Sequence, residues 1–184
     1  MNVTQPVRSR WLETASPVDG KTERKKSMER QIVTCYTDGS CLGNPGVGGF
    51  AAIVKANDIQ KIVKGYSHSY HETNNSMELK AVLYAVRFCA MNIKSPCKIQ
   101  ILTDSQYVCS CWNHDKHWLS TRERPNHDIW IQIIKYLEKS GHEIEMVKIP
   151  GHAGVNENER ADKLAREQAL TARHVIFGGK NERR

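Results

Sequence analysis

The chain has 184 residues, with a hydrophobic fraction of 39%, a charged fraction of 26% and a formal net charge of +7. This length and composition are typical of one globular domain with a single core. The chain contains no run of about 18 apolar residues, and its first thirty residues lack the apolar segment of a secretory signal. We therefore expect neither a membrane span nor secretion.

The basic net charge favours a polyanionic partner, because charge governs association rather than fold. An excess of this size is equally typical of an ordinary solvated surface, so charge alone leaves both interpretations open. Six cysteines are present, but without a secretory signal they indicate reduced thiols rather than disulfides. We expect a cytoplasmic protein.

The two ends of the chain differ from its middle. Residues 1–30 are rich in Pro, Ser, Thr and charge, with no sustained hydrophobic period, so we expect a disordered N-terminal tail. An amphipathic targeting sequence is the alternative, and its acidic residues count against it. Met28 is an alternative start site. We expect the globular domain to span residues 31–173 and a flexible tail to follow over residues 174–184.

Strand and helix patterns alternate between these tails. Three strand-like runs come first, joined by a Gly/Pro turn at residues 43–49 and then by a short turn, so they should form an antiparallel meander. Each later strand follows a segment whose apolar residues recur at helical spacing. The predicted strands are residues 31–39, 50–55, 59–70, 98–103 and 142–149. The predicted helices are residues 74–92, 104–113, 126–141 and 156–170.

The order of these elements is strand, strand, strand, helix, strand, helix, helix, strand, helix. A meander followed by two strands that arrive through helical crossovers predicts an α/β fold. Its sheet should be mixed and five-stranded, with an antiparallel meander, parallel strands and helices on both faces.

Four carboxylates stand out by their positions at the ends of predicted elements: Asp38, Glu78, Asp104 and Asp162. Ligand sites in open sheets lie beyond the carboxyl ends of strands, so Asp38 and Asp104 should lie side by side. Clustered carboxylates raise each other's pKa unless cations neutralise them, and their oxygens suit Mg²⁺. Taken singly, each has an ordinary explanation as a helix-start acid, a cap or a turn former. The four together indicate a metal site.

Four stretches, "YTDGSCLGNPG", "TNNSMELKAV", "LTDSQYV" and "PGHAGVNENERADKLA", resemble in order the signature blocks of ribonuclease H type 1. The resemblance covers roughly residues 31–171. It implies a ribonuclease H-like fold and an endonuclease that hydrolyses the RNA strand of RNA–DNA hybrids, leaving 5′-phosphate and 3′-hydroxyl ends. The family's four carboxylates carry over onto the four residues above. They would bind two Mg²⁺ ions, with Mn²⁺ as a substitute.

The resemblance also assigns roles to other residues. His152 resembles the family's mobile-loop histidine, which assists proton transfer or product release, although a lone histidine is usually structural. Residues expected to contact the hybrid are Cys41, Asn44, Thr73, Asn74, Asn75, Gln106 and Trp130. Turn formation or helix capping is the alternative role for the asparagines, and both roles can coexist. We also expect a monomer.

The segment after the fourth predicted strand is shorter than in family members that carry a long basic handle. It keeps Lys116, Arg122 and Arg124, with Trp118 and Trp130 nearby. Aromatic residues interleaved with cations suit a nucleic-acid channel, although a buried tryptophan is the commoner case. The shortening leaves the affinity for hybrid open.

The same segment contains Cys109, Cys111, His114 and His117 within nine residues. Zinc fingers space their ligand pairs across a longer loop, and the two cysteines would face nearly opposite sides of a helix. We therefore interpret this group as small buried thiols and surface histidines.

Three other classes of protein are weighed against a free-standing nuclease. A non-catalytic hybrid-binding module should have lost a carboxylate, and a nuclease domain fused to a polymerase should follow a long upstream chain. A transposase or integrase core shares strand-borne acids but lacks "NNSMEL" and "GHAG". Cleavage of a labelled RNA–DNA hybrid, with and without Mg²⁺, discriminates among these classes.

Overall fold

The computed structural model describes residues 30–114, 119, 121–151 and 154–178. Its centre is one five-stranded sheet with the strand order β3-β2-β1-β4-β5. Strand β1 pairs antiparallel with β2 and parallel with β4, while β2–β3 is antiparallel and β4–β5 parallel. The strands are β1 (Ile32–Gly43), β2 (Gly46–Ala56), β3 (Ile59–Tyr66), β4 (Lys98–Thr103) and β5 (Glu143–Lys148). The predicted mixed sheet is confirmed.

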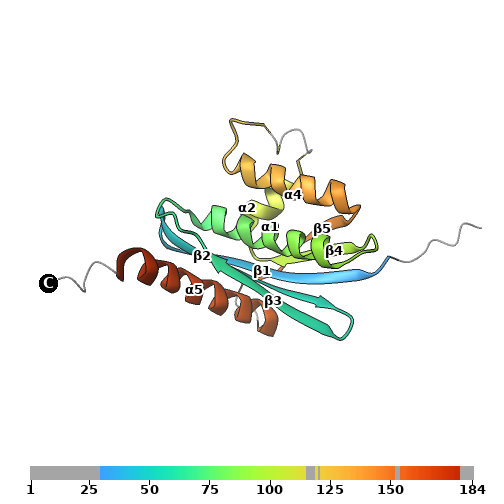
Figure 1. Ribbon diagram of the computed structural model, residues 1–184, viewed down its shortest axis with the longest axis horizontal. Helices are drawn as coiled ribbons and strands as arrows, with labels where there is room; N and C mark the ends of the chain where they lie inside the picture. Colours follow the sequence, from blue (N-terminus) through green and yellow to red (C-terminus); the bar gives the residue numbers. More distant parts are fainter. Residues whose placement is uncertain (1–29, 115–118, 120, 152–153, 179–184) are drawn as a thin grey trace, which may run out of the picture.

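Helices cover both faces of this sheet, as predicted. Figure 1 shows α5 on one face and α1 and α4 on the other. The main core lies on the α1 side, where apolar residues of β1, β2 and β4 meet both helices, and its largest fully buried side chain is Trp130. The described helices are α1 (Asn74–Asn92), α2 (Gln106–Trp112), α4 (His127–Ser140) and α5 (Asn156–Phe177).

Local capping determines where the two helices next to the candidate site begin. Thr73 caps α1, because its hydroxyl accepts from Ser76 N at 3.1 Å and the Ser76 hydroxyl accepts from Thr73 N at 2.9 Å. Ser105 caps α2 by accepting from Val108 N at 3.3 Å. Asp104 therefore does not cap this helix, which removes its ordinary explanation.

The glycine-rich stretch at residues 43–49 is mostly strand, so the prediction of a turn over all of it is wrong. Only Asn44 and Pro45 separate β1 from β2. A Cβ added at Gly49 would lie 2.3 Å from the backbone nitrogen of Ala169, so α5 lies directly against β2 at this point. Glycine is used here for close packing of helix on strand, which overrides its turn propensity.

Two element ends also differ from the predictions. Strand β3 ends at Tyr66, and helix α5 continues to Phe177. Residues 174–177, expected in a flexible tail, are therefore helical. Among the described residues, no helix combines the length and apolar character needed to cross a membrane.

Candidate active site

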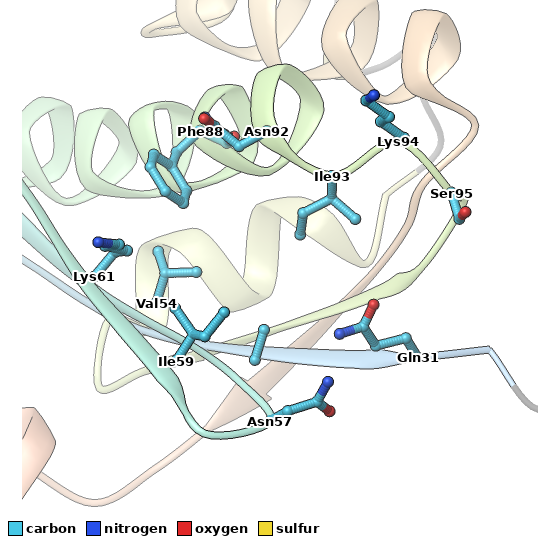
Figure 2. A pocket seen from close by; sticks show the side chains of 11 residues that line it. Gln31, Val54, Asn57, Ile59, Lys61, Phe88, Asn92, Ile93, Lys94 and Ser95 are labelled. Carbon is cyan, nitrogen blue, oxygen red and sulfur yellow. The ribbon is translucent and has the colours of Figure 1, made fainter.

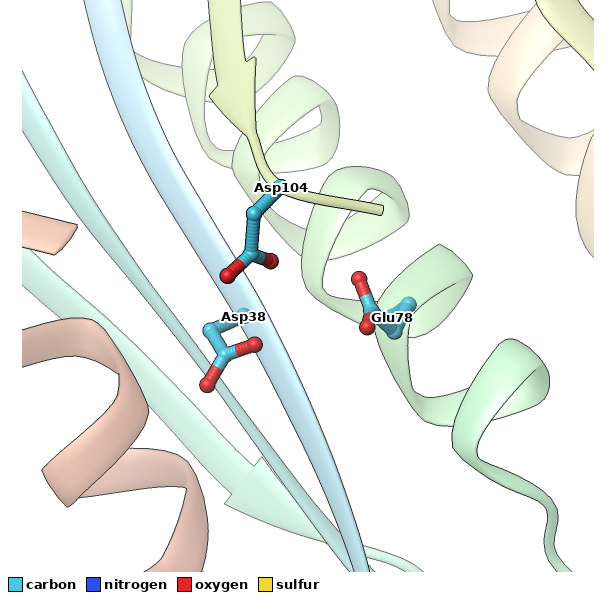
Figure 3. A group of neighbouring side chains, drawn as sticks. All are labelled: Asp38, Glu78 and Asp104. Carbon is cyan, nitrogen blue, oxygen red and sulfur yellow. The ribbon is translucent and has the colours of Figure 1, made fainter. Parts of the chain in front are cut away.

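Three carboxylates converge beside the carboxyl end of β4, next to strand β1 (Figure 3). Asp38 comes from β1, Glu78 from the start of α1, and Asp104 directly follows β4; one oxygen of each lies within 4.8 Å of the others. Tyr36 and Leu102 are paired in the parallel β1–β4 ladder, so each aspartate lies two residues beyond a matched position. The predicted proximity of Asp38 and Asp104 is confirmed.

The carboxylates of this cluster repel one another. Burial, followed by the charges of Glu78, Asp104 and Asp162, raises the pKa of Asp38 to about 8. Burial and then the charge of Asp104 raise the pKa of Glu78 to about 7. The Oε2 atom of Glu78 is buried without a hydrogen-bond partner. An acceptor without a donor, among carboxylates that repel one another, fits a hard cation with oxygen ligands such as Mg²⁺.

Asp162 faces the same space from α5 but stands apart from the three-carboxylate group. It lines a cavity of about 490 Å³ together with Asp38 and Glu78. Its Oδ1 accepts from Arg166 Nε at 2.9 Å, one helical turn along α5. Arg166 also lines the cavity, and the sequence analysis did not identify it. Its spacing of four residues from Asp162 was the available signal.

Lys148, at the end of β5, is a second site residue that the sequence analysis missed. Its Nζ donates to the backbone oxygen of Asp104 at 2.8 Å. Its charge and the hydroxyls of Ser105 and Thr103 counteract part of the rise in the pKa of Glu78. Because β5 runs parallel to β4, the carboxyl ends of the two strands lie side by side. The position of Lys148 at the end of a predicted strand could therefore have indicated that it lies near Asp104.

Comparison with known proteins agrees with this geometry. Residues 30–170 match the family model described as RNase H. A ribonuclease H from Tolumonas auensis is 38% identical over 161 residues, covering 83% of this chain and 98% of the relative. A ribonuclease H from Bradyrhizobium diazoefficiens is 40% identical over 153 residues, covering 79% and 94%.

The chain belongs to the ribonuclease H family. Hydrolysis of the RNA strand of RNA–DNA hybrids, the reaction of this family, is accordingly its activity. Among solved structures it is similar to LC9-RNase H1, described as a type 1 RNase H with the type 2 active-site motif, with a TM-score of 0.67, 24% identity and coverage of 79% and 75%. LC11-RNase H1 in complex with an RNA/DNA hybrid has a TM-score of 0.62 at 21% identity, with coverage of 76% and 98%.

Most of the predicted hybrid contacts of this ribonuclease H gather where the β1–β2 turn meets the start of α1. The backbone nitrogen of Cys41 donates to Asn74 Oδ1 at 3.1 Å, and Asn74 N donates to Asn44 Oδ1 at 3.3 Å. Asn75 is exposed in the first turn of α1, whose cap is Thr73. The structure thus brings together five residues from two distant parts of the sequence.

The other predicted contacts are separate from that group. Gln106 is exposed at the first position of α2, where its Nε2 donates to Ser110 Oγ at 2.7 Å. Trp130 requires a correction, because it is only 1% exposed and stacks on Trp112 within the core. It stabilises the packing of α4 and presents no surface to a substrate.

Several predicted residues lie outside the described part of the chain: His152, Lys116, Trp118 and His117. Gly151, which precedes the predicted histidine, lies against the carboxylate of Asp104, since an added Cβ would be 2.8 Å from Asp104 Oδ2. Within the described ranges, no group of three His, Cys, Asp or Glu residues other than the carboxylates of Figure 3 could hold a metal ion.

Figure 2 shows an apolar hollow at the other end of the sheet. Its volume is about 450 Å³, and Val54, Ile59 and Phe88 contribute to its lining. Asn92 on its rim is about 20 Å from Glu78 along α1, judged by the rise of a helix. This hollow therefore has no part in the carboxylate chemistry.

Proposed function

We propose that this ribonuclease H is a Mg²⁺-dependent enzyme in which Asp38, Glu78, Asp104 and Asp162 bind two ions. The observation that supports this most strongly is the convergence of the Asp38, Glu78 and Asp104 carboxylates, where burial and mutual repulsion raise the pKa values of Asp38 and Glu78. Bound divalent ions would lower the pKa of an attacking water and stabilise charge on the leaving 3′-oxygen. Mn²⁺ has similar oxygen preferences and would substitute.

The protein's own contribution is to position the ligands and the scissile phosphate. Asp38 and Asp104 are held by neighbouring parallel strands, whereas Glu78 is held by a capped helix. Arg166 donates to Oδ1 of Asp162, which leaves Oδ2 as the oxygen that would bind an ion. All four carboxylates come from one chain, so the proposal needs no second subunit.

We further propose that Cys41, Asn44, Thr73, Asn74, Asn75 and Gln106 contact the hybrid. Amide, hydroxyl and backbone groups can bind phosphates and 2′-hydroxyls across a minor groove. The hydrogen bonds that link Cys41, Asn44 and Asn74 fix their relative positions beside the carboxylates. His152 would move a proton or assist product release, as the resemblance implies.

Strand-selective cleavage tests this proposal. With Mg²⁺, we expect an end-labelled RNA–DNA hybrid to be cut only in its RNA strand, giving 5′-phosphate and 3′-hydroxyl ends. Recognition of 2′-hydroxyls on one strand and deoxyribose geometry on the other is the physical reason. Denaturing gels with free RNA and double-stranded DNA of the same sequence provide the controls. Comparable cleavage of either control would rule out the proposed recognition.

Thermal unfolding tests ion binding without relying on cleavage. Because Mg²⁺ binds only the assembled site, a concentration of 100 times Kd should stabilise the fold by about 2.7 kcal/mol. For a domain of this size, the corresponding rise in Tm is about 5–10 °C. Calorimetry of wild type and Asp104→Asn, with NaCl at matched ionic strength, isolates the effect. An equal rise in both proteins would place the ion elsewhere.

A further inference from the structure

Glu72 lies between β3 and α1. It contacts both the β1–β2 turn and the start of α1, which carry most of the proposed hybrid contacts. Its backbone makes a two-way bridge to Gly46, with Gly46 N donating to Glu72 O at 2.8 Å and Glu72 N donating to Gly46 O at 2.9 Å. The thiol of Cys41 donates to the same Glu72 oxygen at 3.2 Å. The backbone of Glu72 thus holds the strands on both sides of the β1–β2 turn.

The side chain of Glu72 accepts hydrogen bonds from three donors, two on α1 and one directly after β3. Its carboxylate accepts from Ser67 Oγ at 2.5 Å, Ser76 Oγ at 2.6 Å and Lys80 Nζ at 2.6 Å. The side chains of Glu72 and Lys80 are only 10% and 23% exposed. Burial acts to raise the pKa of Glu72, but these three donors outweigh it and leave the pKa lowered. The group is therefore an ionised carboxylate at neutral pH.

The Glu72–Lys80 ion pair stabilises the start of α1, which carries two of the proposed substrate-binding amides. Ser76 forms the capping box of α1 with Thr73, and its hydroxyl also donates to the Glu72 carboxylate. Glu72 therefore stabilises the first turn of α1 through Ser76. Asn74 and Asn75 project from that turn. Since Glu72 also holds the β1–β2 turn through Gly46, one residue sets the distance between the turn and the helix.

We propose that the Glu72–Lys80 pair is a positioning device for hybrid binding, which holds Asn44 on the turn and Asn74 on the helix at their mutual spacing. This inference rests on the proposed function of those amides. Glu72 itself is a positioning residue, because its carboxylate is occupied by three protein donors and is not available to substrate. Asp38 lies on β1 and Asp104 follows β4, while the backbone of Glu78 packs directly against Gly39 of β1, so the carboxylate cluster is held by contacts other than the pair.

Kinetics of Glu72→Gln and Lys80→Met test the proposal. Breaking the pair from either side leaves a mostly buried group without its partner and loosens the turn against the helix. We expect KM for a short RNA–DNA hybrid to rise roughly tenfold, as for loss of one hydrogen bond to a charged group. We expect kcat to change less than about twofold, because the carboxylate cluster is retained. The double variant should show a smaller effect than the product of the single effects.

Two further measurements separate positioning from general damage. The Mg²⁺-induced rise in Tm should be unchanged in all three variants, since the carboxylates are intact. Glu145→Gln, which breaks the exposed pair with Lys98 at 3.0 Å on the far side of the sheet, is the matched control and should leave KM unchanged. If Glu72→Gln does not fold, the double variant provides the test, because it leaves no unpaired charge.

A loss in kcat with unchanged KM, or a rise in KM no larger than that of Glu145→Gln, would overturn the positioning role. Failure of the proposed function looks different. In that case the wild-type protein itself would not cleave the hybrid, and Mg²⁺ would not shift its Tm.

Discussion

Asp38→Asn is expected to reduce the rate of hybrid cleavage by roughly 1000-fold, equivalent to about 4 kcal/mol of transition-state stabilisation. The same change should stabilise the fold when no divalent ions are added, because burial and then the charges of Glu78, Asp104 and Asp162 raise the pKa of Asp38 to about 8. Asn is nearly isosteric and removes only the charge. We expect a gain on the order of 5 kcal/mol at pH 8, or about 10–20 °C in Tm.

The stabilisation of the fold by Asp38→Asn should increase as the pH rises. A carboxyl group whose pKa is higher in the folded protein binds its proton more tightly there, so stability is lost as pH rises from about 4 to about 8. Asn does not titrate. The advantage of Asp38→Asn should therefore be nearly absent at pH 4 and reach its full value at pH 8, as measured by urea unfolding without divalent ions.

Asp58→Asn is the matched control, since Asp58 is exposed in the turn between β2 and β3. It should alter neither the rate nor the pH dependence. If Asp38→Asn instead destabilises the metal-free fold by several kcal/mol, about the cost of breaking a buried ion pair, Asp38 is a structural partner and not a metal ligand.

Gly39→Ala should lower both stability and activity, although Gly39 makes no contact through a side chain. An added Cβ would lie 2.1 Å from the backbone nitrogen of Glu78, so β1 and α1 would have to separate. Overpacking of this kind costs about 1–3 kcal/mol, and a misplacement of about 1 Å at a reacting group can lower a rate 100-fold. Urea unfolding and kcat for hybrid cleavage, per folded molecule, measure the two effects.

Gly65→Ala separates these effects. Its added Cβ would meet the Phe50 ring at 2.7 Å, a contact on β3 that involves none of the four carboxylates. We expect lower stability with unchanged kcat. If Gly39→Ala retains the wild-type kcat, then close approach of β1 and α1 is not what holds Glu78 beside Asp38.

The local sequence was sufficient to predict an element wherever one segment contains its own apolar period or cap. The bounds of α1 were predicted correctly from its apolar period, and the structure shows a complete capping box at its start. Asp38 and Asp104 follow apolar runs, and the helical crossover between those runs implies parallel strands with adjacent ends. The candidate metal site was therefore predictable before any contact was known.

The partners of a side chain, and whether it is buried, could be identified only from the tertiary structure. Trp130 has the same helical spacing whether α4 turns it to solvent or to the core, and only the packing of α4 against α1 buries it. The side-chain partners of Glu72 lie after β3 and on two turns of α1, and its backbone partners lie on β1 and β2, so the neighbours of Glu72 in sequence carry no signal of the whole network. Gly49 lies in a strand because α5, more than a hundred residues later in the chain, packs directly against it.

The sequence by itself thus determined which carboxylates are candidate metal ligands, because hydrophobic period and the order of the elements can be read along the chain, although Asp38 lies within β1 and not at its end. Only the tertiary structure decided which residues hold that chemistry in place. Lys148, Arg166 and Glu72 act through contacts with groups on other elements or on another turn of the same helix. Those contacts arise from packing, which depends on the whole chain at once.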